Sequence, residues 1–194
     1  MIQVVPKRER REEILDAAAT LFKERGYAAT TMRDLAEKIG IEAASLYNHI
    51  HGKQDLLRQI CFNTGQAHLA EMTRVEATEA DPATQVRAMI AAHVRLITQD
   101  VAAAAVANEE WRHLKEPYYA EFQQVRRDYE FRFGRLIQRA MASGAFRDIH
   151  PQIALYTILS SLSWLQHWYR AGRSVTAEEI EDSILQLLIE GLQK

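Results

Sequence analysis

Two histidine patterns in the sequence could support metal or acid–base chemistry. His49 and His51 flank one isoleucine in the stretch SLYNHIHGKQDLL, which fits a metal site, a catalytic histidine pair or a surface that contacts a charged partner. Glu110 and His113 have the i, i+3 spacing of a ligand pair in carboxylate-bridged di-iron proteins. That site needs a second Glu-x-x-His pattern and two further glutamates, and the sequence has no second copy. A helical di-metal enzyme is therefore the weaker alternative, and we expect neither a bound metal nor a cofactor.

Other patterns of catalysis are missing as well. The sequence has no Gly-x-Ser-x-Gly pattern, no phosphate-binding glycine loop and no cysteine–histidine nucleophile set, so we predict that the protein is not an enzyme. The single cysteine, Cys61, excludes an internal disulfide and a cysteine-rich zinc site, which favours a reducing, cytoplasmic location. No apolar run predicts a transmembrane helix, and no apolar segment follows the basic N-terminal residues as in a secretory signal. We therefore expect no membrane partner.

The elements that carry these residues are all predicted to be helices. Length and composition allow one large domain or two small ones with a substantial core. Apolar residues at helical spacing, together with glycine, proline and capping residues, mark the helix ends. The predicted helices cover residues 8–25, 32–39, 43–50, 53–75, 82–99, 101–114 (a stretch in which a break is allowed), 118–143, 151–171 and 177–192.

The first three helices form a separate unit in this prediction. Thr31 is the expected N-cap of the second helix, with Asp34 in an aspartate variant of the capping box, and the turn containing Gly40 leads to the third. Two short helices joined by a tight glycine turn are a helix-turn-helix arrangement. Helices this short are unstable alone, so they must share a core. The expected core residues are Phe22, Leu35, Ile39, Leu46 and Ile50.

The helix over residues 43–50 decides how the histidine pair is interpreted. With about 100° between residues, Leu46 and Ile50 face inward, His49 lies on a flank, and His51 falls in the turn beyond. The outward residues are small or polar and include no carboxylate. Asparagine pairs with adenine, serine contacts several base edges, and an alanine methyl meets a thymine methyl. This surface therefore favours contact with DNA, although a helical interaction module that binds no DNA remains an alternative.

The stretch TTMRDLAEKIGIEAASLYNHIHGKQDLL resembles the DNA-binding signature of TetR-family transcriptional regulators. It differs at Glu42, where the family often has a serine or threonine cap, and at Ile50, where it usually has phenylalanine. The resemblance implies an all-α fold, with a helix-turn-helix DNA-binding domain over residues 1–52 and a helical ligand-binding and dimerisation domain over 53–194. It also implies a palindromic operator bound by a homodimer, with further contacts from the basic N-terminal arm. The expected DNA contacts are Thr31, Arg33, Ala44, Ser45, Tyr47, Asn48, His49 and Lys53.

Residues 151–171 are apolar on nearly all sides, and the last helix carries an isoleucine and leucine stripe. Burial within a monomer would explain this pattern, but the resemblance favours a homodimer formed by the last two helices. Aromatic and arginine residues also crowd the second half of the chain, which is typical of a small-molecule site with few polar groups. The expected ligand contacts are Trp111, Tyr118, Phe122, Arg126, Trp164, His167, Trp168 and Arg170.

Residues from EEWRHL to EGL are similar to a TetR subgroup that controls fatty-acid, steroid or aromatic-acid catabolism and responds to acyl-CoA thioesters. An acyl-CoA needs an apolar slot for its chain and cations for its phosphates. A drug-like aromatic compound is the alternative effector. Repression is the family's usual mode, so the expected function is a repressor that a small hydrophobic effector releases from DNA.

Overall fold

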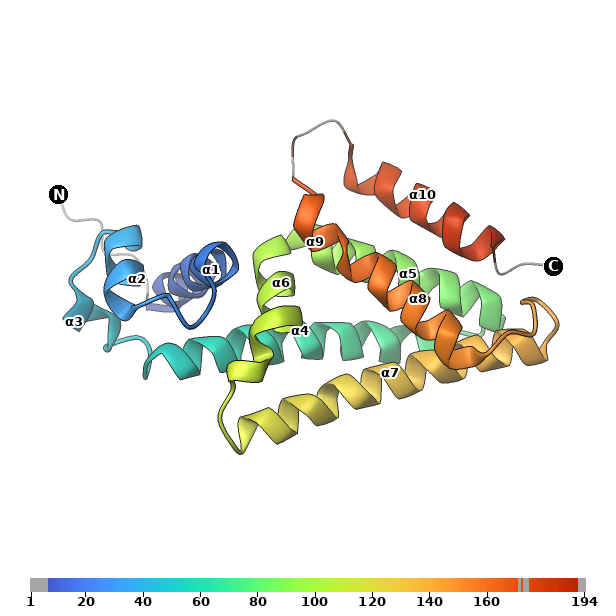
Figure 1. Cartoon of the computed structure of the whole chain (residues 1–194), viewed down its shortest axis with the longest axis horizontal. Coiled ribbons are helices and arrows are strands. Elements are labelled where there is room, and N and C mark those ends of the chain that lie inside the picture. The colour runs from blue at the N-terminus through green and yellow to red at the C-terminus, as the bar shows by residue number, and fades with distance from the viewer. Residues whose placement is uncertain (1–6, 171, 173–174, 192–194) are drawn as a thin grey trace. The chain divides into compact units, whose positions relative to one another are not determined.

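The computed structural model describes residues 7–170, 172 and 175–191, and within them it contains helices and no strand (Figure 1). The all-α prediction is therefore confirmed. The helices are α1 (Lys7–Arg25), α2 (Met32–Ile39), α3 (Ala43–Leu46), α4 (Lys53–Glu76), α5 (Pro82–Gln99), α6 (Val101–Glu109), the 3-10 helix η1 (Glu110–His113), α7 (Tyr118–Ala142), α8 (Pro151–Ser163), α9 (Leu165–Trp168) and α10 (Ala177–Glu190).

The chain divides into two compact units. Unit 1 contains the described residues up to Thr64 together with Ala102–Phe122, and unit 2 contains Gly65–Val101 and the described residues from Gln123 onward. The division falls inside α4 and α7 and after the first residue of α6. The predicted functional boundary between residues 52 and 53 thus lies within unit 1, and it stays a prediction about which residues contact DNA.

Three helix starts follow the local signals in the sequence. The hydroxyl of Thr31 accepts a hydrogen bond from the Asp34 amide at the start of α2, and the Asp34 carboxylate accepts one from the Thr31 amide. Thr176 and Glu179 make the same reciprocal pair at α10, and Asp81 caps α5 with a proline in its first turn. These caps satisfy amides that the helices leave without an internal acceptor, so the predicted starts of all three helices are confirmed.

Two predicted helices are shorter than expected. The third was predicted over residues 43–50, but α3 ends at Leu46, and the amides of Asn48 and His49 bond to the third residue back, Ser45 and Leu46. Its N-cap, Glu42, makes no side-chain capping bond. The helix predicted over 151–171 breaks at Trp164, where α8 ends and the four-residue α9 follows. The carbonyl of Trp164 accepts from the His167 amide, again three residues on, a spacing that tightens the turn.

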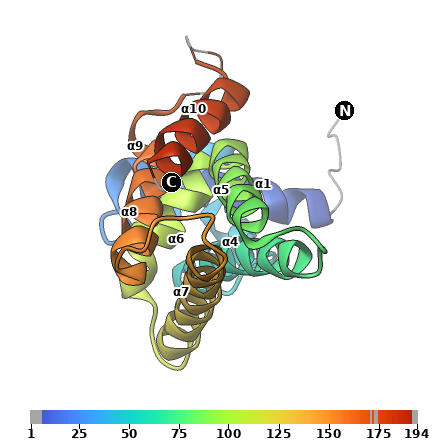
Figure 2. The ribbon, with the colours of Figure 1, turned by 90° about the vertical axis from the view of Figure 1, so that its right-hand side faces the viewer.

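Each unit has its own core. In unit 1, α2 packs against α1 and α3, and the predicted core residues Phe22, Leu35, Leu46 and Ile50 are buried while Ile39 is partly exposed. In unit 2, α5 packs against α8, α9 and α10 (Figure 2). Burying large apolar side chains stabilises each unit by about 1.5–3 kcal/mol per side chain, which holds the surface residues in place.

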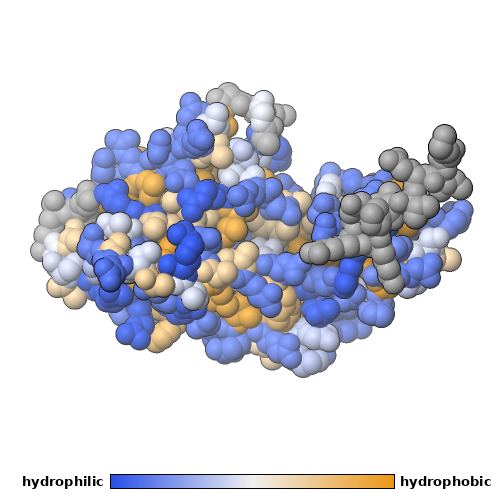
Figure 3. All heavy atoms as spheres, turned by 180° about the vertical axis from the view of Figure 1, so that it is seen from behind, coloured by the Kyte–Doolittle hydropathy of each residue, from blue (hydrophilic) through white to orange (hydrophobic). Residues whose placement is uncertain are grey.

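Charged and polar groups dominate much of the surface. On the face drawn in Figure 3, the hydrophobic residues lie in patches between hydrophilic ones. No single helix among the described residues is long and apolar enough to cross a membrane, and only the bent pair of α5 with α6–η1 meets the length and composition criteria together. The described residues include no group of three or more histidine, cysteine, aspartate or glutamate side chains placed to hold a metal ion.

Candidate nucleic-acid interface and ligand site

The predicted DNA contacts gather on α2, α3 and the turn after α3. Ala44, Tyr47 and Asn48 are exposed, and the Tyr47 side chain is 56% exposed. Ser45 and His49 are half-buried beside them, while Leu46 and Ile50 anchor the segment from behind at 0% and 1% exposure. The core thus fixes one side of this short segment and leaves small and polar side chains on the other. The inward positions of Leu46 and Ile50 are as predicted, although the segment is helical only as far as Leu46.

Thr31 and Arg33 extend this surface onto α2, and both are exposed. The Thr31 hydroxyl also lies 2.6 Å from an Asp34 carboxylate oxygen, to which it donates. These bonds from Thr31 lower the pKa of Asp34 below its usual value, and Arg25, whose guanidinium lies 3.5 Å from the carboxylate, acts in the same direction. Asp34 is thereby held as an anion that fixes the start of α2, and Thr31 has this structural role besides any contact with a partner.

Lys53 has a structural role that the sequence did not predict. Its ammonium donates hydrogen bonds to the carbonyls of Tyr27, Ala28 and Thr30 at 2.7, 3.3 and 2.8 Å. It also lies 4.2 Å from the centre of the Tyr27 ring, close enough for a cation–π interaction. Partial burial lowers the pKa of Lys53. The side chain therefore ties the start of α4 to the turn after α1, so its substitution must affect stability as well as any contact with phosphate.

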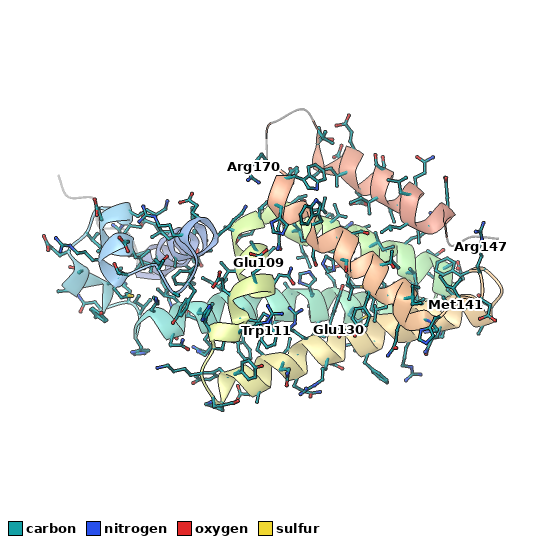
Figure 4. The ribbon with its side chains drawn as sticks, viewed as in Figure 1. Glu109, Trp111, Glu130, Met141, Arg147 and Arg170 are labelled. Carbon is teal, nitrogen blue, oxygen red and sulfur yellow. The ribbon has the colours of Figure 1, made fainter. Side chains whose placement is uncertain are left out.

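Three predicted ligand residues, with two others, form an aromatic cluster in unit 1. Trp111 of η1 (labelled in Figure 4) stacks on Tyr119 at 5.3 Å and lies 6.1 Å from Phe122. Phe62 of α4 contacts both Phe122 and Tyr118, at 5.4 and 6.4 Å between ring centres. Trp111 and Phe122 are buried and Tyr118 is exposed. Sequence reasoning missed Phe62, because nothing in the periodicity of α4 separates it from an ordinary core residue.

The other five predicted ligand residues lie in unit 2. Trp164 and His167 pack against each other at 4.6 Å, and Trp164 and Trp168 are 63% and 48% exposed. Arg170, also labelled in Figure 4, is exposed, and its guanidinium donates to the carbonyl of Tyr169. Arg126 is half-buried on α7. Arg173, a further candidate cation, lies outside the described residues, as do the side chains of Lys7 and Arg8 in the basic arm.

A cluster of polar rings that the sequence did not predict lies inside unit 2. His93 of α5 is buried, with its Nδ1 2.9 Å from the hydroxyl of Tyr129, and its ring meets that of His68 edge to face at 4.5 Å. Burial, and secondarily the charge of His68, hold the pKa of His93 well below its usual value, so it is neutral at pH 7. Burial also raises the pKa of Tyr129. The only available signal was that His93 interrupts an otherwise apolar helix face.

Large apolar side chains are exposed along α8 and on α10. Ile153 is 64% exposed and Leu187 76% exposed. On α8, Ile153 and Tyr156 line an open groove of about 670 Å³ that also includes serine, threonine and glutamine side chains. Single exposed apolar side chains are common on protein surfaces, whereas a large contiguous apolar patch marks a surface that binds a partner.

Two family models match the chain. The bacterial regulatory protein tetR family matches residues 14–60, which cover α2, α3 and the first part of α4, and the tetracyclin repressor-like C-terminal domain matches residues 79–192. The second match alone covers more than half of the chain. Neither match says which individual side chains contact DNA or an effector.

Relatives of known identity agree with these models. The HTH-type transcriptional repressor KstR2 of Rhodococcus jostii is 29% identical over 189 residues, which are 96% of this chain and 92% of that protein. The structure of the ketosteroid transcriptional regulator KstR2 of Mycobacterium tuberculosis superimposes with a TM-score of 0.90 at 25% identity, over 99% of this chain and 97% of that one. The regulator AibR, crystallised with isovaleryl coenzyme A and operator DNA, shares the fold with a TM-score of 0.80 at 24% identity over 93% of this chain and 98% of that one.

Proposed function

The chain belongs to the TetR family of transcriptional regulators, which are not enzymes, and from that premise we propose that it is a repressor that binds a palindromic operator as a homodimer and leaves it when a small hydrophobic effector binds. The observation that carries the DNA-binding part is the surface of α3 and the turn after it. Ala44, Tyr47 and Asn48 are exposed there, and Leu46 and Ile50 hold the segment from behind.

The side chains of this surface suit a major groove. Small residues allow close approach of the backbone, and Asn48 has the donor and acceptor needed to pair with adenine. Tyr47, Ser45 and His49 flank it, and Thr31, Arg33 and Lys53 are the proposed phosphate contacts, which set the register rather than the sequence preference. Two copies of this surface about one DNA turn apart would read the two halves of a palindrome.

A homodimer through α8 and α10 accounts for the exposed apolar residues of unit 2. Ile153, Tyr156 and Leu187 would be covered by the same surfaces of a second copy, as two-fold symmetry requires. Repressors of palindromic sites need this symmetry, so the dimer and the operator are linked parts of one proposal.

An acyl-CoA thioester is the proposed effector class. Support comes from the described KstR2 relatives, whose name connects them with ketosteroids, and from the isovaleryl coenzyme A bound to AibR. Each unit offers candidate contacts of its own. The aromatic cluster around Trp111 and Phe122 in unit 1 offers apolar surface. In unit 2, Arg126 and Arg170 offer cations, and Trp164, His167 and Trp168 offer exposed rings. An effector can release the operator only if it binds one conformation better than the other.

The decisive experiment selects an operator from a random duplex library and measures its affinity by fluorescence anisotropy. We expect a palindromic consensus, and Asn48→Ala should lose about 1–3 kcal/mol of discrimination at one base pair of each half-site. Lys38→Ala, which changes an exposed lysine on α2 outside the proposed contacts, is the matched control. A protein that selects no duplex, or an Asn48→Ala variant with unchanged preference, would contradict the proposed interface.

The effector is tested on the selected complex. Short, long and ring-bearing acyl-CoA thioesters are compared with free coenzyme A, the corresponding free acids and a set of aromatic drug-like compounds. Release by one thioester class at micromolar concentration supports the proposal. Release by the aromatic compounds alone would assign the alternative effector, and no release by any thioester would reject the acyl-CoA class.

A further inference from the structure

The Glu-x-x-His pattern, which has no partner pattern for a metal, has a different setting in unit 1. Both side chains point at Tyr27, in the turn that follows α1. The Glu110 carboxylate accepts a hydrogen bond from the Tyr27 amide at 3.2 Å. The ring of His113 stacks on the ring of Tyr27, with centres 5.3 Å apart and planes 26° apart. Glu110 and His113 therefore bind the turn between the first two helices.

The 3-10 geometry of η1 explains why these two residues act together. Side chains three residues apart in a 3-10 helix lie almost in line along one face. Glu110 and His113 are so spaced, and the carboxylate and the imidazole Nε2 lie 3.4 Å apart. The i, i+3 spacing that resembled half of a di-iron site here places an acceptor and a ring on the same side of a short helix.

Gln54 fastens the same segment from α4. Its amide nitrogen donates to the Tyr27 hydroxyl and to the His113 carbonyl, both at 2.7 Å. Its amide oxygen accepts from the Lys115 backbone amide at 3.2 Å. The Gln54 carboxamide thus bonds to the Tyr27 side chain in the turn after α1, to the last residue of η1, and to Lys115 in the segment between η1 and α7. Lys53, the preceding residue, donates to the Tyr27 carbonyl, so the first turn of α4 bonds to both the backbone and the hydroxyl of Tyr27.

Trp111 follows Glu110 in η1 and packs into the aromatic cluster with Tyr119 and Phe122. Consecutive residues of a 3-10 helix are about 120° apart, so Trp111 and the Glu110–His113 pair leave the helix in different directions. A movement of η1 that follows a shift of Trp111 would change the bonds of η1 to Gln54 and Tyr27.

We propose that Gln54, Glu110 and His113 form a clip on Tyr27 that transmits the state of the aromatic cluster to the DNA-binding helices. The proposal rests on the function proposed above, since it assumes an operator-bound state. The clip is suited to switching because most of its hydrogen bonds are part-buried or exposed, and water can replace such bonds at a small net cost. Coupling of this kind is reciprocal: if a ligand at the cluster changes operator affinity, the operator changes the clip.

The test uses this reciprocity and needs no effector. Hydrogen exchange of the full-length wild-type protein is measured at single-residue resolution with and without an operator selected from random duplexes. The Lys115 amide reports directly, because its acceptor is the Gln54 side chain. We expect the operator to change exchange at residues 110–115 in the wild type. In Gln54→Ala, exchange at Lys115 without DNA should be about fivefold faster, as expected for the loss of one modest hydrogen bond, and the operator-dependent change should disappear.

Tyr27→Phe provides a second variant that removes only the hydroxyl and keeps the ring on His113 and Lys53. It should weaken the operator-dependent change without abolishing it. Asn63→Ala, at an exposed position of α4 within unit 1, should behave as wild type. Thermal melting followed by circular dichroism checks that each variant is folded.

The outcomes separate the two proposals. If no duplex is selected, the proposed function fails and the clip loses its premise. If an operator is bound but exchange at 110–115 does not respond in the wild type, or responds equally in Gln54→Ala, the clip is not the coupling element. Binding of the operator by Gln54→Ala with an unresponsive 110–115 segment supports it.

Discussion

The two units differ in the kind of side chain that they expose. In unit 1, the exposed residues on α3 and the turn after it are alanine, tyrosine and asparagine, and large aromatic rings such as Phe22 and Phe122 are buried. In unit 2, isoleucine and tryptophan side chains are exposed along α8 and at its end, while His93 and Tyr129 are buried inside. A surface of small polar groups suits a polar partner that approaches closely, whereas an exposed apolar face suits a second apolar face. The difference agrees with the proposal that unit 1 contacts DNA and that unit 2 contacts a second copy of the chain.

The largest effect should come from the residue that supports the polar surface from behind. Leu46→Ala removes a fully buried side chain from α3 and should cost about 2–5 kcal/mol of unfolding free energy, because the short helix cannot close the cavity. Urea unfolding of wild type and variant measures this loss. Ala44→Ser, an equally small change on the exposed side of α3, should leave the midpoint within error. A stable Leu46→Ala protein would show that the core does not position this surface.

A charge on the apolar face of α8 tests the other half of the comparison. Ile153→Glu should weaken dimerisation by about 100-fold or more, because each dimer would lose two buried apolar side chains and gain two charges. Since Ile153 is mostly exposed in the single chain, the monomer should stay folded. Sedimentation over a concentration series measures the change.

Gln66→Glu is the control for this variant, because it adds the same charge at an exposed position on α4. It should leave the dimer intact. A wild-type protein that sediments as a monomer at micromolar concentration would remove the dimer and leave α8 for another partner.

Burial of His93 in unit 2 predicts that the free energy of unfolding depends on pH. The folded-state pKa of His93 lies below its unfolded value because burial disfavours the cation, so the unfolded chain binds more protons in acid. The stability contributed by the neutral ring is present above about pH 6.5, and it is lost below that pH at up to about 1.4 kcal/mol per unit. Urea unfolding between pH 7.5 and 5 should show this slope in the wild type and a smaller one in His93→Gln. The slope should persist in His150→Gln, which changes an exposed ring.

Substitution of Lys53 distinguishes a contribution to stability from a contact with DNA. Lys53→Ala removes the ammonium from three backbone carbonyls and should lower the unfolding free energy by about 1–2 kcal/mol. Tyr47→Ala, at an exposed side chain, should leave it unchanged, while both variants weaken operator binding. Thermal melting together with anisotropy distinguishes the two. An unchanged melting temperature for Lys53→Ala would mean that the Lys53 hydrogen bonds do not stabilise the fold and that this residue acts only as a phosphate contact.

The sequence predicted features that depend on neighbouring residues and missed those that depend on distant ones. The Thr31 cap and the predicted helix starts at residues 82 and 177 are confirmed, because the capping bonds of Thr31, Asp81 and Thr176 each join residues within a few positions. By contrast, the hydrogen bond between Gln54 and Lys115 joins residues 61 positions apart in the chain, and no local pattern of α4 indicates this contact. The Glu110–His113 spacing was compared with a di-iron ligand pair and that site was not expected, but spacing alone does not say what the two side chains face.

The smallest predicted effect concerns the start of α3. Glu42 occupies the N-cap without a side-chain bond, although serine or threonine at this position would accept from an amide of the first turn. Glu42→Ser should therefore raise the unfolding free energy by about 0.5–1 kcal/mol and, by removing an exposed negative charge beside the proposed phosphate contacts, strengthen operator binding. Glu42→Gln removes the charge without supplying an effective cap, so it should share the gain in affinity but not the gain in stability. Melting and anisotropy on both variants separate capping from charge, and equal stability of Glu42→Ser and wild type would mean that the turn-like end of α3, rather than its missing cap, limits this helix.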